Sequence, residues 1–336
     1  MDPFEKRVLG RTGLEVTQLG FGAAQLGELS QTVPETEAQE AIAAAYEAGV
    51  NFWDTSPWYG IGLSEHRLGH DLRARPRDSF VLSTKVGRVM TRPADVNQVD
   101  KEPWVGGLLF NHHFDYSYDG VMRSYEDSLM RLSLNRVDLL LIHDLDRVEH
   151  GSEDAVEAYL RQLDGGGFKA LDQLRAAGEI KGIGAGINLA DMVPGLLGRF
   201  DLDVLLVAMP YSLLDQSPAE QLALCAERNI GVIKGAPYAS GILASDQGSF
   251  NYGRAPETIV AQVRAIHAVC ERHGVALRAA ALQFLLAHPA VATVIPGPRS
   301  KAELLDNIEM VQAPIPHAFW AEMKAEGLIA QHAPTP

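Results

Sequence analysis

Gly20-Phe21-Gly22-Ala23-Ala24-Gln25 is the stretch of this 336-residue sequence that decides its fold. It lies early in the chain, where an open dinucleotide-binding sheet carries Gly-x-Gly-x-x-Gly after its first strand. Two glycines of that pattern are present, but Gln25 stands in place of the third. The sequence therefore favours a closed (β/α)8 TIM barrel, of class α/β, over a doubly wound open sheet.

Short apolar segments alternate with longer segments of helical periodicity along the chain. Apolar runs this short are typical of strands buried on both faces of a parallel sheet. The expected strands are 18–22, 51–53, 80–84, 137–142, 180–185, 204–207, 231–233 and 291–295. Two helices, at 256–272 and 277–287, are expected before the last strand. About eight strand–helix units in a chain of this length match a barrel.

Three segments are additional to a minimal barrel. Residues 7–16 contain two β-prone runs around Gly13 and predict an N-terminal β-hairpin. Residues 87–119 and 236–255, rich in glycine and proline, are expected to be two long substrate loops, because loops of that length are usually functional. The sequence has no Pro- or Ser-rich linker and no repeat, so residues 1–336 are expected to form one domain.

The charge balance excludes several classes of partner. The chain has 43 acidic and 29 basic residues, a formal net charge of −14 that disfavours nucleic acids and anionic membranes. No run of 18 apolar residues is present, and the N-terminus lacks the apolar segment of a secretory signal. Cys225 and Cys270 are expected to be packing residues in a reduced compartment. We therefore expect a cytoplasmic protein.

Four polar side chains stand where successive expected strands end. Asp54, Lys85 and His143 each follow an apolar run, and Tyr59 comes five residues after Asp54. Singly, each has a structural explanation as a cap, a solvated charge, a core histidine or a packing tyrosine. In barrels, however, the chemistry lies at these strand ends, and consecutive strands are neighbours. An acid, a phenol, an amine and an imidazole in this order therefore predict a catalytic site.

The chain resembles the aldo-keto reductase superfamily over nearly its whole length. The matching passages are 9–22, 49–60, 64–69, 83–87, 138–143 and 294–307, with Asp54-x4-Tyr59, Ser83-Thr-Lys85 and the strand-end His143 as the specific motifs. Segments 82–88, 115–124 and 142–146 are most similar to the bacterial aldose 1-dehydrogenases. That branch includes D-threo-aldose, L-fucose and galactose dehydrogenases, and a related pyridoxal 4-dehydrogenase.

The resemblance implies a catalytic role for each of the four residues. Tyr59 would be the general acid/base, Lys85 its activator, Asp54 the partner of Lys85, and His143 the residue that orients the reacting oxygen. The physical chemistry agrees, because a free tyrosine phenol has a pKa of about 10 and a nearby ammonium stabilises its phenolate. A carboxylate keeps a recessed lysine charged, and a neutral imidazole can donate to the substrate oxygen.

The substrate is expected to meet Tyr59 and His143 together with Trp58, Trp104 and Phe110. Tyr116 could add to an aromatic-lined pocket of the kind that pyridoxal would need.

A zinc site built from His112, His113, His143 and Asp144 is the alternative use of the histidines. Adjacent histidines rarely reach one ion, and regular ligand spacing is lacking, so no metal is expected.

By resemblance, a nicotinamide dinucleotide lies extended across the strand ends. The expected contacts are Gly22, Asp54, Asn188, Tyr211, Tyr238, Gly297, Arg299, Glu303 and Asn307. The residues expected around the nicotinamide depart from the family pattern. Residues 186–188 stand in place of a Ser-Asn pair, and Ala208 stands in place of a glutamine. The aromatic residue that usually stacks on the nicotinamide would fall near Gly235, and Tyr238, three residues further on, is the candidate substitute.

The residues expected around the adenosine of the cofactor favour NAD over NADP. Members that prefer NADP carry lysine just after Ile-Pro and arginine six residues later, whereas Gly297 and Glu303 hold these positions here. A carboxylate repels a 2′-phosphate and accepts hydrogen bonds from ribose hydroxyls. Arg299 and Lys301 leave NADP open, and Glu303 could simply begin a helix.

The leading expectation is an NAD(P)-dependent oxidoreductase that oxidises the anomeric hydroxyl of an aldose to the lactone. The alternatives are a pyridoxal 4-dehydrogenase, a general aldehyde or ketone reductase, and a cofactor-sensing binding subunit that acts through a partner. The sequence carries no signal for an oligomeric state.

Overall fold

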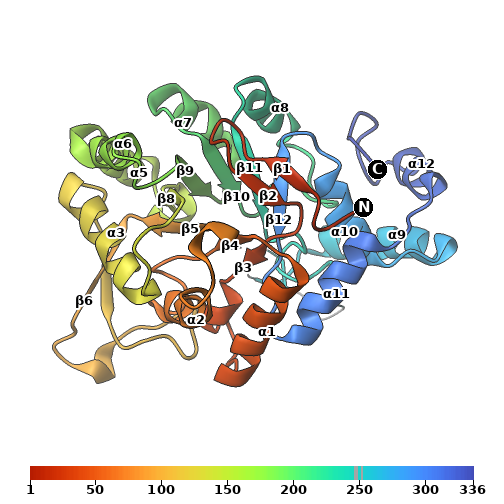
Figure 1. Cartoon of the computed structure of the whole chain (residues 1–336). Coiled ribbons are helices and arrows are strands. Elements are labelled where there is room, and N and C mark those ends of the chain that lie inside the picture. The colour runs from red at the N-terminus through yellow and green to blue at the C-terminus, as the bar shows by residue number, and fades with distance from the viewer. Residues whose placement is uncertain (246–248, 251–252) are drawn as a thin grey trace.

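Eight parallel strands form one sheet that curves into a barrel (Figure 1). The computed structural model describes residues 1–245, 249–250 and 253–336. In spatial order the strands are β12 (Val291–Ile295), β11 (Gly231–Gly235), β10 (Val204–Val207), β9 (Gly182–Ile187), β8 (Leu139–His143), β5 (Val81–Val86), β4 (Phe52–Asp54) and β3 (Phe21–Gly22). Leu19 pairs in parallel with Val294, and the Gly20 amide donates to the Val294 carbonyl oxygen at 2.9 Å. These bonds join the β3 edge to β12, so the predicted (β/α)8 barrel is confirmed.

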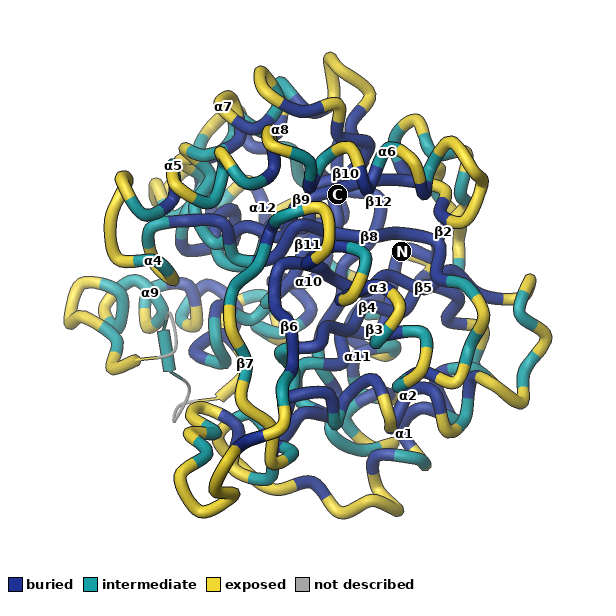
Figure 2. Tube along the Cα trace, turned by 90° about the vertical axis from the view of Figure 1, so that its left-hand side faces the viewer, coloured by how far each residue is buried: buried dark blue, intermediate teal, exposed yellow. Residues whose placement is uncertain are grey.

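Helices surround the barrel and expose their outer faces, apart from one helix whose residues 279–286 are all buried (Figure 2). They are α1 (Glu35–Ala48), α2 (Leu63–Leu72), α3 (Tyr118–Leu132), α4 (Arg147–His150), α5 (Glu153–Gln162), α6 (Phe168–Ala176), α7 (Val193–Arg199), α8 (Ala219–Glu227), α9 (Glu257–His273), α10 (Leu277–Leu286), α11 (Lys301–Gln312) and α12 (His317–Ala325). Ser117 and Ser300 cap α3 and α11 through side-chain oxygens, and glycines in the left-handed region end α1 and α9. No helix within the described ranges is long and apolar enough to cross a membrane.

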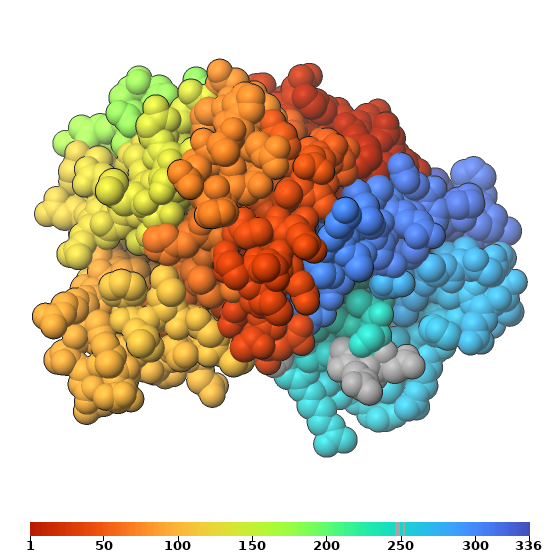
Figure 3. Space-filling view, turned by 60° about the horizontal axis from the view of Figure 1, so that its bottom comes forward, coloured from red at the N-terminus to blue at the C-terminus, as the bar shows by residue number. Residues whose placement is uncertain are grey.

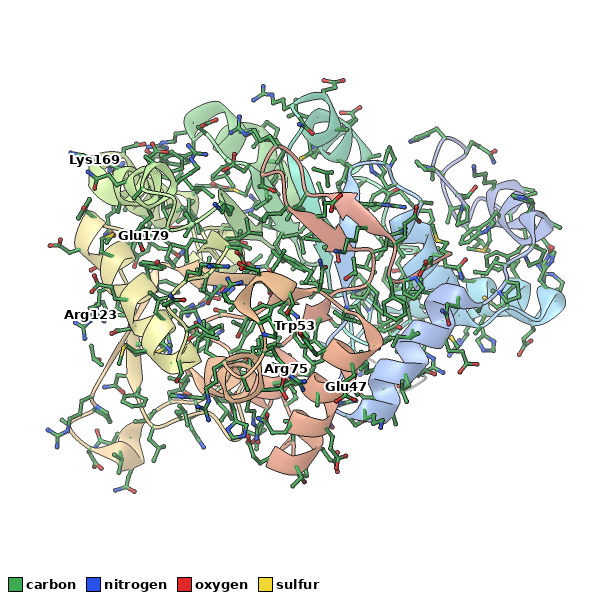
Figure 4. The ribbon with its side chains drawn as sticks, in the orientation of Figure 1. Glu47, Trp53, Arg75, Arg123, Lys169 and Glu179 are labelled. Carbon is green, nitrogen blue, oxygen red and sulfur yellow. The ribbon has the colours of Figure 1, made fainter. Side chains whose placement is uncertain are left out.

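The core has two layers because successive strand side chains point to opposite faces. Phe52 and Leu141 fill the barrel interior, whereas Trp53 and Leu140 pack between the strands and the helices. Trp53 lies well inside the molecule, and Arg123 and Lys169 lie at its margin (Figure 4). Strands buried on both faces explain why their sequences lack polar alternation.

The N-terminal hairpin is confirmed as β1 (Lys6–Val8) paired antiparallel with β2 (Glu15–Thr17). Leu9 and Val16 pack into the barrel interior, and the Arg11 Nε donates to Asp203 Oδ1 at 2.7 Å. The hairpin therefore covers the end of the barrel where the strands begin.

Segment 87–119 differs from the expected irregular loop, because its two ends form a β-hairpin. β6 (Arg88–Thr91) pairs antiparallel with β7 (Asn111–Phe114), and the stretch between them is irregular apart from a short 3₁₀ helix at Val96–Gln98. The second expected loop, 236–255, includes residues 246–248 and 251–252, which lie outside the described residues. The β6–β7 segment protrudes at the lower left of Figure 3, in orange. That residues 1–336 form one domain stays a prediction.

We predict that Gly69→Ala destabilises the protein, although alanine is normally the better helix former. A Cβ on Gly69 of α2 would lie 2.2 Å from the Leu132 carbonyl oxygen at the end of α3. Overpacking of this kind costs about 1–3 kcal/mol, more than the helix-propensity gain of about 1 kcal/mol. Guanidinium denaturation measures the change in the free energy of unfolding.

Gly195→Ala on α7 is the matched control, because a Cβ there meets no described atom within 4 Å. It should leave stability unchanged or raise it by up to about 1 kcal/mol. Equal effects of the two substitutions would contradict the close approach of α2 to α3.

Candidate active site

Asp54, Lys85, His143 and Tyr59 come together at the ends of three neighbouring strands. Asp54 ends β4, His143 ends β8, and Lys85 is the penultimate residue of β5. The Lys85 Nζ donates to Asp54 Oδ2 and to the Thr55 carbonyl oxygen, each at 2.8 Å. Lys85 and Asp54 are each only 1% exposed, so the ion pair is shielded from water.

Tyr59 is placed beside this pair by a tight turn after β4. The Lys85 Nζ lies 4.6 Å from the centre of the Tyr59 ring, and the His143 ring meets Tyr59 edge-on at 5.8 Å. Gly60 in the turn has a φ of +66°, and a Cβ on Gly27 would lie 2.4 Å from the Gly60 amide nitrogen. The position of Tyr59 thus depends on two glycines that have no signal in the sequence pattern.

Burial sets the protonation of the site. It raises the pKa of Asp54, which the Lys85 ammonium opposes. It lowers the pKa of His143 to about 3, against the attraction of Asp144, so the imidazole is neutral near pH 7. The site therefore combines one buried ion pair with a neutral imidazole.

Tyr59 and two neighbouring tryptophans form one aromatic wall of the site. Trp104 lies 5.7 Å from both Tyr59 and Trp58, measured between ring centres. We call Trp58, Tyr59 and Trp104 the aromatic wall. Phe110, by contrast, is 42% exposed near the end of the irregular stretch before β7, and Tyr116 is fully buried and donates to the His143 carbonyl oxygen at 2.6 Å.

His112 packs against the aromatic wall rather than beside His113. Its ring lies 4.4 Å from that of Trp58, and burial lowers its pKa to about 4. Successive residues of a strand point to opposite faces, so His113 faces away from His112 in β7.

Arg88 is an important residue that sequence reasoning missed. Its guanidinium is buried between the rings of Trp58 at 4.2 Å and Phe114 at 4.3 Å, and it pairs with Asp144 at 3.0 Å and Glu149 at 2.9 Å. The sequence offered one signal, an arginine directly after a strand-end glycine, but its stacking partners are distant in the chain.

A cleft of about 520 Å³ begins at Tyr59 and Asp54 and reaches the start of α11. Seven of the nine predicted cofactor residues line it: Gly22, Asp54, Tyr238, Gly297, Arg299, Glu303 and Asn307. Gln25, Arg278 and Asp306 also line it and were not predicted.

The two other predicted cofactor residues lie elsewhere. Tyr211 is 1% exposed and stacks on Phe284 at 5.4 Å. The Asn188 Nδ2 donates to Asp144 at 3.2 Å and to Asp146 at 3.1 Å, and Asn188 lines a separate pocket of about 340 Å³.

A closed α/β barrel with its polar cluster and cleft at the strand ends defines the general class, a barrel enzyme. The chain belongs to the aldo/keto reductase family, whose model matches residues 18–326, and it is an oxidoreductase.

Several characterised proteins are similar to this chain along its length. It is 43% identical to pyridoxal 4-dehydrogenase of Microbacterium luteolum, covering 97% of this chain and 98% of the relative. It is 37% identical to D-threo-aldose 1-dehydrogenase of a Pseudomonas species, covering 96% and 97%. L-galactose dehydrogenase of Arabidopsis thaliana is 32% identical, covering 93% and 89%. The structure of an aldo-keto reductase from Bacillus halodurans in its holo form aligns with a TM-score of 0.73 and 25% identity, covering 98% and 99%.

We predict that Lys85→Met lowers the free energy of unfolding by about 3–5 kcal/mol, because it leaves the buried Asp54 carboxylate without its countercharge. Adding Asp54→Asn should recover part of the loss, since the second substitution removes the unpaired charge. Chemical denaturation of the single and double variants measures both effects. Lys181→Met, at an exposed lysine, is the control and should change stability by no more than about 0.5 kcal/mol. Wild-type stability of Lys85→Met would show that the pair is not held as two charges.

Proposed function

We propose that this enzyme is an NAD-dependent dehydrogenase that oxidises the hydroxyl of a cyclic hemiacetal to a lactone, with an aldose as the first candidate substrate. The observation that carries the proposal is the buried Lys85–Asp54 pair beside Tyr59 and His143 at one end of the cleft. This arrangement supplies a proton acceptor, the charge that activates it and a neutral hydrogen-bond donor.

The cleft fits an extended nicotinamide dinucleotide. Its volume is in the range of small-molecule sites, and it joins Tyr59 to the N-terminus of α11, where helix amides favour phosphate oxygens. Gly22 allows β3 to lie close to β12 beside the cleft, because a Cβ there would lie 2.7 Å from the Ile295 carbonyl oxygen. Ala208 adds only a methyl group to the lining, and Gly235 adds no side chain. We assign the binding to the seven predicted residues that line the cleft, and omit Tyr211 and Asn188 because neither lines it.

We assign a separate role in the reaction to each of the four residues at the strand ends. When bound, the nicotinamide supplies the acceptor for the hydride that leaves the substrate carbon. The Tyr59 phenolate accepts the proton of the substrate hydroxyl as the carbon–oxygen double bond forms. Lys85 stabilises that phenolate, and Asp54 compensates the charge of Lys85. His143 donates to the substrate oxygen and orients it.

The charges at the far end of the cleft support NAD over NADP. Arg299 donates from its backbone amide and guanidinium to Glu303, with contacts from 2.8 Å, and Arg278 forms an ion pair with Asp306. Both cleft-lining arginines are thus already compensated by carboxylates. Among the described residues that line the cleft, a 2′-phosphate would therefore meet no arginine without a carboxylate partner.

Pyridoxal is the second candidate substrate, because Trp58 and Trp104 of the aromatic wall offer flat rings beside Tyr59. Its cyclic hemiacetal presents the same reacting group as an aldose, and the relative from Microbacterium luteolum is named for it. A panel of aldoses, pyridoxal and simple aldehydes, assayed by NADH absorbance, tests the proposal. Turnover of an aldose or pyridoxal supports it; turnover of simple aldehydes alone indicates a general reductase; no turnover with cofactor bound indicates a binding subunit.

We predict that Tyr59→Phe lowers oxidative turnover by a factor of about 10² or more, because the ring is kept while the proton acceptor is lost. The measurement is kcat with the best substrate, together with the Kd for NADH, which should stay near the wild-type value. Near-wild-type turnover in a folded variant would refute the mechanism.

The wild-type pH profile is the companion measurement. Oxidative kcat should rise from pH 7 toward pH 9 and flatten once the phenolate prevails. His143 adds no inflection in this range, because burial holds its pKa at about 3. A flat profile with chemistry rate-limiting would mean that Tyr59 is not the proton acceptor.

Cofactor choice gives a separate prediction. Glu303→Arg with Gly297→Lys should shift the NAD/NADP ratio of kcat/KM toward NADP by at least about tenfold, or roughly 1.4 kcal/mol. Glu309→Arg makes the same charge change as Glu303→Arg at an exposed position of α11 and is the control for that substitution. A ratio that moves equally in both variants, or a wild type that already prefers NADP, would contradict the assignment.

A further inference from the structure

The His143 ring has one polar side chain beside each of its two nitrogens. The Ser56 hydroxyl oxygen lies 3.0 Å from Nδ1, and Asp144 Oδ2 lies 3.4 Å from Nε2. Ser56 is fully buried and His143 is 6% exposed, so these neighbours, rather than water, determine which nitrogen carries the proton.

The hydrogen bonds of Ser56 identify the acceptor. Its oxygen accepts from the Trp58 backbone amide at 3.0 Å. Among the described residues, its one remaining polar neighbour is Nδ1 of His143. If Nδ1 carried the proton, the buried Ser56 hydroxyl would have no acceptor, at a cost of about 1–3 kcal/mol. The hydroxyl therefore donates to an unprotonated Nδ1.

Asp144 selects the same tautomer from the other side. Burial opposes its ionisation, yet the Arg88 guanidinium and the Asn188 amide hold the pKa of Asp144 below its ordinary value. Its carboxylate is fixed by Arg88 at 3.0 Å and by the Asn188 amide at 3.2 Å. A lone pair on Nε2 would face this negative charge, whereas an N–H on Nε2 is attracted to it.

We propose that Ser56 and Asp144 are positioning residues that fix His143 as the neutral tautomer with its proton on Nε2. At 3.4 Å, the Nε2–Asp144 contact is longer than a normal N–H···O bond of up to about 3.2 Å. The carboxylate therefore attracts the N–H without forming a full hydrogen bond with it, and the N–H stays available to the substrate oxygen. This catalytic meaning rests on the proposed function; the tautomer itself does not.

Nitrogen-15 NMR of the labelled, substrate-free protein tests the proposal directly. The chemical shifts of the His143 ring, identified by their loss in His143→Gln, should show a protonated Nε2 and an unprotonated Nδ1. Ser56→Ala should convert this into a mixture of the two tautomers. In the same variant kcat should fall about ten- to a hundredfold with KM little changed, as for other outer partners of a functional histidine.

Two further variants control the experiment. Ser56→Thr keeps the hydroxyl and should restore the tautomer and most of the activity. Ser128→Ala removes another buried serine hydroxyl, one that accepts from Arg131 at 3.1 Å, and should alter neither.

A proton on Nδ1 in the wild type would overturn the proposal, as would a Ser56→Ala protein with unchanged tautomer and rate. If Ser56→Ala does not fold, Asp144→Asn replaces it, with the same expected change in tautomer. Failure of the proposed function is distinguishable, because it appears as full activity of Tyr59→Phe and leaves the NMR result unaffected.

Discussion

Two opposite charges, those of Lys85 and Asp54, are buried together at the strand ends of this barrel without access to water. Removing the Lys85 ammonium and the Asp54 carboxylate from water costs several kcal/mol per ion, which their contact at 2.8 Å and the bond to the Thr55 carbonyl offset only in part. Well-packed apolar residues would often be as stable or more so. A pair of this kind is therefore better explained by what it does for a neighbour, and the neighbour is the Tyr59 ring.

That constraint extends into the backbone around Tyr59. The turn that carries it is tied to α2 by the bond between the Thr55 and Ser64 hydroxyls at 2.9 Å, and Ser64 donates to the Ala23 carbonyl oxygen at 2.8 Å. The phenol therefore sits on backbone anchored to β3 and α2 rather than on a free loop. Rigid support of this kind keeps a reacting group within a fraction of an ångström of its working position.

The barrel and the four polar residues could be predicted because local signals encode them. Each strand is an apolar run, and each polar residue follows one. Other features depend on distant contacts or on backbone angles. Tyr211 has a φ of +66°, which a sequence pattern does not reveal, and its ring stacks on Phe284. Arg278 reaches the cleft from α10, far in sequence from the residues beside it. The β6–β7 hairpin was missed because its exposed strand carries adjacent histidines instead of an apolar run.

The base and the tip of the β6–β7 hairpin differ in what they contact beside the candidate site. At its base, the Arg88 guanidinium lies between Trp58 and Phe114 and pairs with Asp144 beside His143. The base thus connects the aromatic wall to the surroundings of the imidazole. The irregular stretch between β6 and β7 carries exposed apolar residues such as Leu109 and Phe110. These exposed side chains can differ without moving Arg88, because the β6–β7 pairing lies between them. The same stretch is fixed to the Tyr59 turn by the buried Trp104 and by the bond from the Leu108 amide to the Gly60 carbonyl oxygen at 2.9 Å. On this arrangement, substrate selection can change at the tip while the reacting groups stay where the buried ion pair and the guanidinium hold them.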